Sequence, residues 1–209
     1  MIQFLSIAFR NMRTVGTICP SSPMLSKALC EVVRDAPSPR RVLEVGPGTG
    51  PVTREILKLL RAGDQLDIVE LSAEFCQDLE RNALGRWRAA NPGHPARVTL
   101  HNASILDVPL PTAPYDCIVC GLPFNNFDSE LVEAIMRRML ELLRSGGELS
   151  YFAYVGAKTV KRSIADQDGR RNLDAIRRIE RDLHLTHSGS SRMVLANFPP
   201  AFMRRLRKP

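Results

Sequence analysis

The glycine-rich stretch at residues 44–50, EVGPGTG, constrains the fold of this 209-residue chain more than any other feature. A short aliphatic run precedes it and apolar residues follow it at helical spacing, so the pattern predicts a strand that turns sharply into a helix. Gly46, Gly48 and Gly50 carry no side chain, which allows unusual backbone angles and lets a ligand approach the main chain. The N–H groups of such a turn favour an anionic group. A tight turn without a ligand is the alternative, and three alternating glycines count against it.

Strand-like and helix-like segments alternate along the rest of the chain. The expected strands are 41–45, 65–70, 97–101, 115–120, 148–155, 183–188 and 192–198, the last two joined by a turn at Gly189. Such alternation is typical of a parallel sheet covered by helices. The sequence therefore predicts an α/β fold: a Rossmann-like, seven-stranded, mostly parallel sheet with helices on both faces and a C-terminal antiparallel hairpin.

Composition divides the chain into three expected parts. Residues 1–39 form an N-terminal helical cap and membrane-binding segment, residues 40–200 the main domain, and residues 201–209 a basic tail after a Pro-Pro break. Within residues 2–13 the apolar side chains occupy one helical face, with the arginines largely opposite. Such a helix either caps the core or lies on a membrane surface, and the sequence alone favours neither. Ser22 is a good N-cap for a second helix.

The net charge of +7 and the pI near 9.5 indicate a polyanionic partner, either nucleic acid or an anionic membrane surface. The five cysteines lack the paired spacing of a zinc site, so we expect no metal. Cys117 and Cys120 lie in an expected strand and should point to opposite faces, which suits packing. No segment has the apolar length of a membrane span and no secretory signal is evident, so the expected location is the cytoplasm.

An acidic residue ends the second expected strand. Glu70 lies twenty positions beyond Gly50, the spacing at which a carboxylate meets ribose hydroxyls in nucleotide-binding α/β folds. A solvated acid at a strand end is the alternative. The glycine-rich turn upstream favours the ribose ligand.

Taken together, these motifs resemble the Rossmann-like S-adenosylmethionine-dependent methyltransferases over roughly residues 40–200. An NAD-dependent oxidoreductase competes, but its turn normally reads GxGxxG, and this one reads GxGxG. The resemblance implies that S-adenosylmethionine is the cofactor, with its ribose on Glu70. The residues that it assigns to the methionine end are Glu44, Gly46, Gly48 and Gly50, and those that it assigns to the adenine are Asn102, Ala103 and Ser104. Asn102 is equally well explained as a turn former.

The turn GLPFNNF, residues 121–127, follows the fourth strand, where open α/β sheets place the reacting partner. This turn resembles one in the adenine and glutamine N-methyltransferases. In those families an Asn, which holds a planar amino group, stands where this chain has Gly121. The chain also resembles the rRNA adenine dimethyltransferases in its LPF step and its charge. Glycine at position 121 counts against a nucleobase acceptor.

A closer resemblance is to the bacterial phospholipid N-methyltransferases and their ornithine-lipid relatives. It rests on the amphipathic N-terminus, a VGxIxPSS-like segment at 15–22, EVGPGTG, GLPF and a closing NxPPA at 197–201. It implies N-methylation of phosphatidylethanolamine or a related aminolipid, in phospholipid metabolism, by a peripheral protein on the inner face of the cytoplasmic membrane. Nucleic acid is then not the expected partner. An rRNA adenine N6-methyltransferase and a non-catalytic cofactor-binding or membrane-binding module remain as alternatives.

Direct displacement by a neutral amine needs alignment and deprotonation rather than a metal or a covalent nucleophile. The residues expected to accept N–H bonds or line the acceptor pocket are Gly121, Leu122, Pro123, Phe124, Asn125, Phe127, Tyr151 and Tyr154. Aromatic faces suit an alkylated cation, although strand tyrosines are commonly only packed in the core. His101 is a weaker candidate for a base. The positive residues expected to meet lipid phosphates, or equally RNA phosphates, are Lys158, Lys161, Arg162, Arg170, Arg171 and the C-terminal cluster Arg204, Arg205, Arg207 and Lys208.

Overall fold

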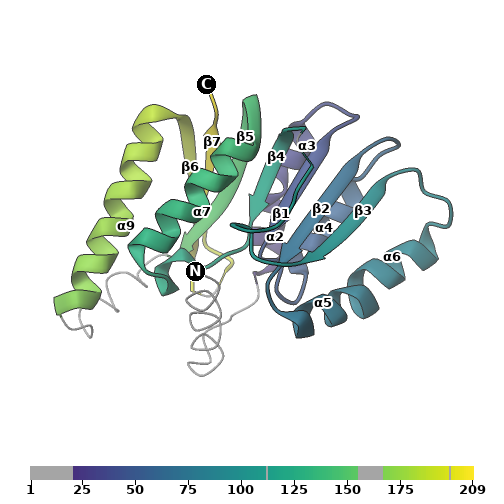
Figure 1. Cartoon of the computed structure of the whole chain (residues 1–209), viewed down its shortest axis with the longest axis horizontal. Helices are drawn as coiled ribbons and strands as arrows, with labels where there is room; N and C mark the ends of the chain where they lie inside the picture. Colours follow the sequence, from purple (N-terminus) through teal and green to yellow (C-terminus); the bar gives the residue numbers. More distant parts are fainter. Residues whose placement is uncertain (1–20, 112, 155–166, 198) are drawn as a thin grey trace.

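The computed structural model describes residues 21–111, 113–154, 167–197 and 199–209. Within these ranges one sheet has seven strands in the order β3-β2-β1-β4-β5-β7-β6 (Figure 1). The strands are β1 (Arg41–Val45), β2 (Gln65–Glu70), β3 (Arg97–Asn102), β4 (Tyr115–Cys120), β5 (Leu143–Tyr154), β6 (Ser188–Val194) and β7 (Ala201–Arg207). Strands β1 to β5 pair in parallel, whereas β7 runs antiparallel to both β5 and β6. The predicted fold class is confirmed.

Helices cover both faces of the sheet, and each face has its own apolar core. One core packs the sheet against α7 (Ser129–Leu142) and α9 (Gln167–Thr186), with Ile135 and Ile176 fully buried. The other packs it against α2 (Pro23–Leu29), α3 (Glu31–Asp35) and α4 (Pro51–Leu59). The remaining helical segments are α5 (Ala73–Leu79), η1 (Glu80–Leu84), α6 (Gly85–Ala90) and the short η2 (Phe124–Asn126). As expected, Ser22 caps α2, accepting a bond from the Leu25 N–H at 3.2 Å.

The two cysteines of β4 show that this strand is buried on both faces of the sheet. Cys117 belongs to the core under α2 to α4, and Cys120 belongs to the core under α7 and α9. Both thiols are buried, and burial raises the pKa of each to about 12. The expectation that they point to opposite faces is confirmed. A strand buried on both sides reads as the continuous apolar run seen in its sequence.

The C-terminal hairpin lies further along the chain than the sequence predicts. Residues 183–186 belong to α9, and residues 201–207, expected in a basic tail, form β7 between β5 and β6. Ala201, Met203 and Leu206 are buried, and the arginines between them obscured this alternation in the sequence. The strand therefore belongs to the sheet, and its basic side chains are not on a tail.

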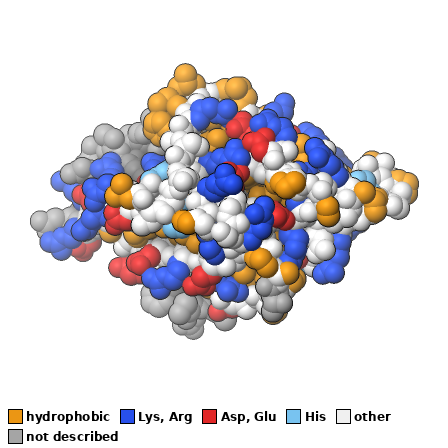
Figure 2. All heavy atoms as spheres, turned by 90° about the horizontal axis from the view of Figure 1, so that it is seen from above, with side chains coloured by type: hydrophobic (Ala, Val, Ile, Leu, Met, Phe, Trp, Pro, Cys, Tyr) orange, Lys and Arg blue, Asp and Glu red, His pale blue; other side chains and the backbone are white. Residues whose placement is uncertain are grey.

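Strand β7 ends at the edge where the parallel strands begin, since Arg207 pairs with Glu148 near the start of β5. Figure 2 looks down on this edge and shows Lys and Arg side chains interspersed with acidic ones. Arg205, for example, bonds Asp35 at 3.0 Å and also bonds Glu148. Arg207 thus lies toward the edge opposite the loops that follow β1 to β4, whereas Arg204 pairs with Tyr151, further along the sheet.

Several sequence predictions concern residues outside the described ranges. They are the helix at 2–13, Val15 to Pro20 of the VGxIxPSS-like segment, Cys19, and Lys158, Lys161 and Arg162. Among the described residues, no helix combines the length and apolar character that crossing a bilayer requires. The same part of the chain holds no cluster of three His, Cys, Asp or Glu side chains placed to bind a metal ion.

A buried ion pair determines where β1 and β2 begin. Arg40 Nε lies 3.0 Å from Asp64 Oδ2, and neither side chain is exposed. Asp64 also accepts bonds from Ser38 Oγ at 2.6 Å and from the Arg61 N–H at 2.9 Å. The Arg40 guanidinium donates to the carbonyl groups of Val33, Ala36 and Leu59. The pair thus ties both strand starts to the ends of α3 and α4.

Replacing Asp64 with Ala should lower the free energy of unfolding by about 3–5 kcal/mol, because it leaves the Arg40 charge buried without its counter-ion. Urea unfolding measures the loss. The control is Glu133→Ala, which breaks the exposed pair with Arg137 and should cost no more than about 1 kcal/mol. Equal losses in the two variants would contradict a structural role for the buried pair.

Candidate active site

The glycine-rich turn leaves β1 through three residues with left-handed backbone. The φ angles of Gly46, Gly48 and Gly50 are 68°, 56° and 78°, in a region that side chains rarely adopt. The Gly46 N–H donates to the Val69 carbonyl at 3.0 Å, and the Gly50 N–H donates to the Pro47 carbonyl at 3.0 Å. Gly50 is the N-cap of α4, so the predicted strand-to-helix turn is confirmed.

The three glycines differ in what surrounds them. A Cβ on Gly46 would lie 2.2 Å from Leu122 Cδ2, and one on Gly50 would lie 2.6 Å from Leu79 Cδ2. A Cβ on Gly48 would meet nothing within 4 Å. A side chain at either of the outer two positions would therefore displace a leucine side chain, in addition to the strain of the positive φ. At Gly48 the backbone has open space above it, as a ligand that approaches the main chain needs.

Glu70 lies directly beside this open position. It is almost completely buried, its Oε2 accepts a bond from the Gly48 N–H at 3.1 Å, and its Oε1 accepts one from the Ser72 N–H at 2.8 Å. Burial raises the pKa of Glu70, although these N–H bonds act in the opposite direction. The structure brings together the predicted loop and the predicted ribose ligand. Each oxygen keeps a second lone pair with which to accept a hydroxyl.

Glu44 lies beneath the turn, fully buried between β1 and α4. Thr53 Oγ1 donates to its Oε1 at 3.0 Å, whereas its Oε2 is buried without a hydrogen-bond partner. Burial raises the pKa of Glu44 to about 8. A buried carboxyl group with an unsatisfied oxygen is stabilised by a cation placed nearby, so this position suits a positively charged ligand in the turn.

The residues predicted to contact adenine divide into two roles. Asn102 Nδ2 donates to the carbonyl groups of Glu70 at 3.1 Å and Leu71 at 3.0 Å, which is the turn-forming role. Ala103 and Ser104 instead line a cavity of about 20 Å³. Its other lining residues come from the ends of β1, β2 and β4 and from neighbouring segments, and are Val45, Gly46, Val69, Leu71, Ile105, Leu122 and Ile135. The carboxyl ends of four parallel strands thus meet at one small apolar hollow.

The GLPF turn packs against the glycine loop through the backbone. The Gly121 N–H donates to the Val45 carbonyl at 2.8 Å, and a Cβ on Gly121 would lie 2.6 Å from the Gly46 carbonyl oxygen. A side chain there requires the backbone of one of the two turns to move. The sequence pattern identified the missing Asn but not this steric requirement, which depends on the partner loop.

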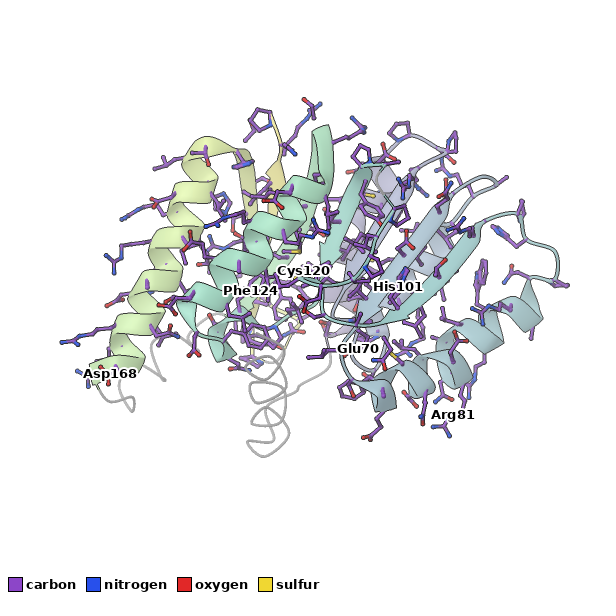
Figure 3. All side chains as sticks on the ribbon, in the orientation of Figure 1. Glu70, Arg81, His101, Cys120, Phe124 and Asp168 are labelled. Atoms are coloured by element: carbon purple, nitrogen blue, oxygen red, sulfur yellow. The ribbon has the colours of Figure 1, made fainter. Side chains whose placement is uncertain are left out.

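Leu122, Pro123, Phe124 and Asn125 lie in the short helix η2 or just before it, and Phe124 is close to the end of β4 at Cys120 (Figure 3). The Leu122 carbonyl accepts from the Phe124 N–H at 3.1 Å, and the Pro123 carbonyl accepts from the Asn126 N–H at 2.9 Å. Asn125 is half-buried on this helix. The Leu122 and Pro123 carbonyl groups therefore shape the turn. Each of these two oxygens has one lone pair left for a substrate N–H.

The aromatic side chains do not form one open pocket. Phe124 packs edge-to-face on Phe127 and on Tyr151, with ring centroids 6.4 Å and 6.0 Å away, and all three rings are buried. Burial raises the pKa of the Tyr151 hydroxyl. Tyr154 packs against Phe152 on the other face of the sheet. The structure thus joins three of the predicted rings beneath the acceptor turn and separates Tyr154 from them.

His101 belongs to a different network. Its Nε2 lies 2.8 Å from Asp67 Oδ1, and the Tyr115 hydroxyl donates to Asp67 Oδ2 at 2.9 Å. This network links β2, β3 and β4, and none of its members lines the small hollow. A second hollow, of about 730 Å³, lies between α7 and α9, and it contains none of the residues predicted to bind the cofactor or to line the acceptor pocket.

A Rossmann-like sheet with a glycine-rich turn after β1, a carboxyl group at the end of β2 and the GLPF turn after β4 is the arrangement expected of an S-adenosylmethionine-dependent methyltransferase. Residues 42–147, about half of the chain, match the methyltransferase domain family, and the chain belongs to that family.

Two curated relatives share about a quarter of the aligned residues. One is an uncharacterized methyltransferase of Anoxybacillus flavithermus, 27% identical over 69% of this chain and 62% of its own length. The other is an ornithine lipid N-methyltransferase of Singulisphaera acidiphila, 28% identical over 69% of this chain and 72% of its own length. Ubiquinone/menaquinone biosynthesis C-methyltransferases of Pseudomonas are matched over about 40% of their length. The chain thus spans less than two thirds of several relatives.

Among solved structures, an O-methyltransferase from Bacillus cereus in complex with SAH shares the fold. Its TM-score is 0.68 at 18% identity, covering 99% of this chain and 91% of that one. The predicted enzyme class and the predicted cofactor are confirmed at the level of the family. The open backbone at Gly48 and the two buried carboxyl groups fit a cationic cofactor with a ribose.

Replacing Gly48 with Val should weaken binding of S-adenosylhomocysteine by at least about tenfold, because the side chain would occupy the open space. Titration calorimetry measures the affinity. The matched control is Gly93→Val, since Gly93 also has a positive φ, of 73°, and open surroundings. Both variants carry comparable backbone strain, of about 1–2 kcal/mol. Unchanged affinity in a folded Gly48→Val protein would contradict our assignment of the loop.

The ligand-free protein should lose stability as pH rises from about 5 to 8, because folded Glu44 has a pKa of about 8 against 4.5 when unfolded. The contribution of the protonated carboxyl is complete below pH 4.5 and disappears as pH passes 8. Glu44→Gln should remove a slope of up to about 1.4 kcal/mol per pH unit in urea unfolding. The exposed Glu133→Gln substitution should leave the slope of stability against pH unchanged. A Glu44→Gln protein with the same slope as the wild type would contradict the assignment of this pH dependence to Glu44.

Proposed function

We propose that this protein transfers methyl groups from S-adenosylmethionine to the amine head group of a membrane aminolipid, either phosphatidylethanolamine or an ornithine lipid. The observation that carries this proposal is the contact between Gly121 and the Gly46 carbonyl oxygen. It leaves no room for the Asn with which adenine N-methyltransferases are expected to hold a planar base. The ornithine lipid N-methyltransferase among the relatives supports the same acceptor class.

The cofactor would be held by the turn at 46–50, with Glu70 at its ribose and Glu44 beneath it. When bound, it supplies an electrophilic methyl group on a sulfonium cation. Glu44 and Glu70 are both buried beside the turn and stabilise positive charge there, although burial raises the pKa of each. The small apolar hollow at Ala103 and Ser104 lies at the same edge of the sheet.

The acceptor amine would approach the GLPF turn. Carbonyl groups of Leu122 and Pro123 retain a lone pair for its N–H groups, which orients the nitrogen toward the methyl group. An ammonium group must lose a proton before it attacks, and residues 121–127 contain no titratable side chain. The proton therefore leaves to water in this scheme. Phe124, Phe127 and Tyr151 support the turn from below.

Membrane association is part of the proposal. The net charge of +7 suits an anionic surface, and the amphipathic pattern of residues 2–13 suits the interface between lipid and water. Of the basic residues of β7, Arg207 is assigned no part in it, because it pairs with Glu148, which pairs with Cys117 toward the edge of the sheet opposite the acceptor turn. We place the protein on the inner face of the cytoplasmic membrane, as a peripheral protein.

Purified protein incubated with labelled S-adenosylmethionine should transfer label to vesicles of phosphatidylethanolamine or ornithine lipid mixed with an anionic lipid. Ribosomal RNA in a parallel reaction should remain unlabelled. Gly48→Val should transfer less label than the wild type, because it should bind the cofactor at least about tenfold more weakly. Pelleting the same vesicles measures membrane association. Label in RNA and none in lipid would overturn the lipid assignment, and label in neither pool would favour a non-catalytic module.

A further inference from the structure

One side chain of α9 holds the acceptor turn. The Ser129 N–H donates to Asn172 Oδ1 at 2.7 Å, and Asn172 Nδ2 donates to the Phe127 carbonyl at 2.9 Å. A single amide thus bonds the backbone on both sides of Asp128, where the turn ends and α7 begins. Asn172 lies more than forty residues further along the chain, so no local sequence pattern connects it with the turn.

The two bonds replace interactions that the turn does not make for itself. Asp128 occupies the N-cap position of α7, but its side chain makes no capping hydrogen bond. The first N–H groups of a helix need an acceptor, and Asn172 Oδ1 supplies one from a different helix. The second bond fixes the Phe127 carbonyl, at the residue that closes η2. The amide provides both the acceptor and the donor, whereas an ionised carboxylate provides only acceptors.

We propose that Asn172 is a positioning residue that holds the GLPFNNF turn in the geometry needed for the methyl acceptor. This inference rests on the proposed function, because it takes that turn to be the acceptor site. A continuous series of contacts carries the effect. Phe127 packs on Phe124, the Phe124 N–H bonds the Leu122 carbonyl, and the Leu122 side chain covers Gly46. A shift at Phe127 therefore reaches the acceptor carbonyl groups.

Removing the amide should not detach α9 from the protein. Leu173 and Ile176, on the same helix, are buried, and Ile176 belongs to the core under α7 and α9. A second link, between Glu180 and Arg204 of β7, spans 3.7 Å. The fold of an Asn172 variant is consequently held by contacts that the substitution leaves in place, so its effects can be measured in a folded protein.

The test compares Asn172→Ala with Asn172→Asp. Alanine removes both bonds. Aspartate keeps an acceptor for the Ser129 N–H and places a negative charge at the start of α7, which is favourable, but it cannot donate to the Phe127 carbonyl. We expect the Asp variant to keep a melting temperature near that of the wild type, while kcat for lipid methylation falls about tenfold in both variants. The affinity for S-adenosylhomocysteine should stay within about twofold, since the Gly48 and Glu70 contacts remain.

A second measurement does not depend on activity. Hydrogen exchange should accelerate about tenfold in peptides covering residues 121–132 of Asn172→Ala, and stay unchanged in peptides covering residues 44–52. The control is Asn82→Ala, which removes an exposed hydrogen bond from Asn82 of η1 to Asp78 of α5. This substitution should alter neither hydrogen exchange in these peptides nor kcat.

The outcomes separate the two proposals. Unchanged exchange at residues 121–132 would overturn the positioning role. Faster exchange with unchanged kcat would also overturn it, as would full recovery of kcat in the Asp variant. If wild-type protein labels RNA and no lipid, the lipid function fails; the positioning role then stands if exchange and kcat on RNA respond as predicted, and falls if they do not.

Discussion

The backbone contact between the ends of β1 and β4 is the constraint on which the rest of the site depends. The Gly121 N–H bonds the Val45 carbonyl, and the Gly121 Cα approaches the Gly46 carbonyl too closely for any side chain. Two turns that emerge from adjacent parallel strands are thereby held against each other through their backbones, with the Leu122 side chain packed over Gly46. Because one turn is assigned to the methyl donor and the other to the acceptor, this contact sets the distance between the two substrates. Proximity of this kind accounts for much of the rate enhancement in a displacement reaction.

The two buried carboxyl groups near the turn have different surroundings and so different roles. Glu70 is bonded to the backbone at both oxygens, which holds it in a single geometry. Glu44 has one bonded oxygen and one without a partner, which makes its charge costly in the ligand-free protein. A cationic ligand relieves that cost. The turn thus combines a rigid carboxylate, suited to hydroxyl groups, with a buried carboxyl group whose protonation responds to what is bound above it.

Much of this arrangement could be predicted from the sequence. The apolar runs and the spacing of Gly46, Gly48, Gly50 and Glu70 are local features, and they gave β1, β2, β4 and the turn. What could not be predicted depends on contacts between distant segments. Arginines between the buried residues of β7 disguised a strand as a tail. The separation of Tyr151 from Tyr154 is a different case, because residues three positions apart on a strand point to opposite faces, and period-2 alternation alone predicts it. The steric role of Gly121 and the two bonds of Asn172 depend on partners far away in the chain, and no residue pattern near either position reveals them.

The position of β7 between β5 and β6 has a consequence for the order in which the protein assembles. Strands β1 to β5 can pair as they are synthesised, but β6 has β7 as its only neighbour in the described sheet, and β7 is the last strand made. The hairpin must therefore form and join β5 as a unit, at the cost of closing the chain between β5 and β7. Helix α9 lies within that closing segment. We expect the half of the sheet that bears the glycine turn to form early and the Asn172 bonds to the acceptor turn to form last. The donor side of the protein is then complete before its acceptor side.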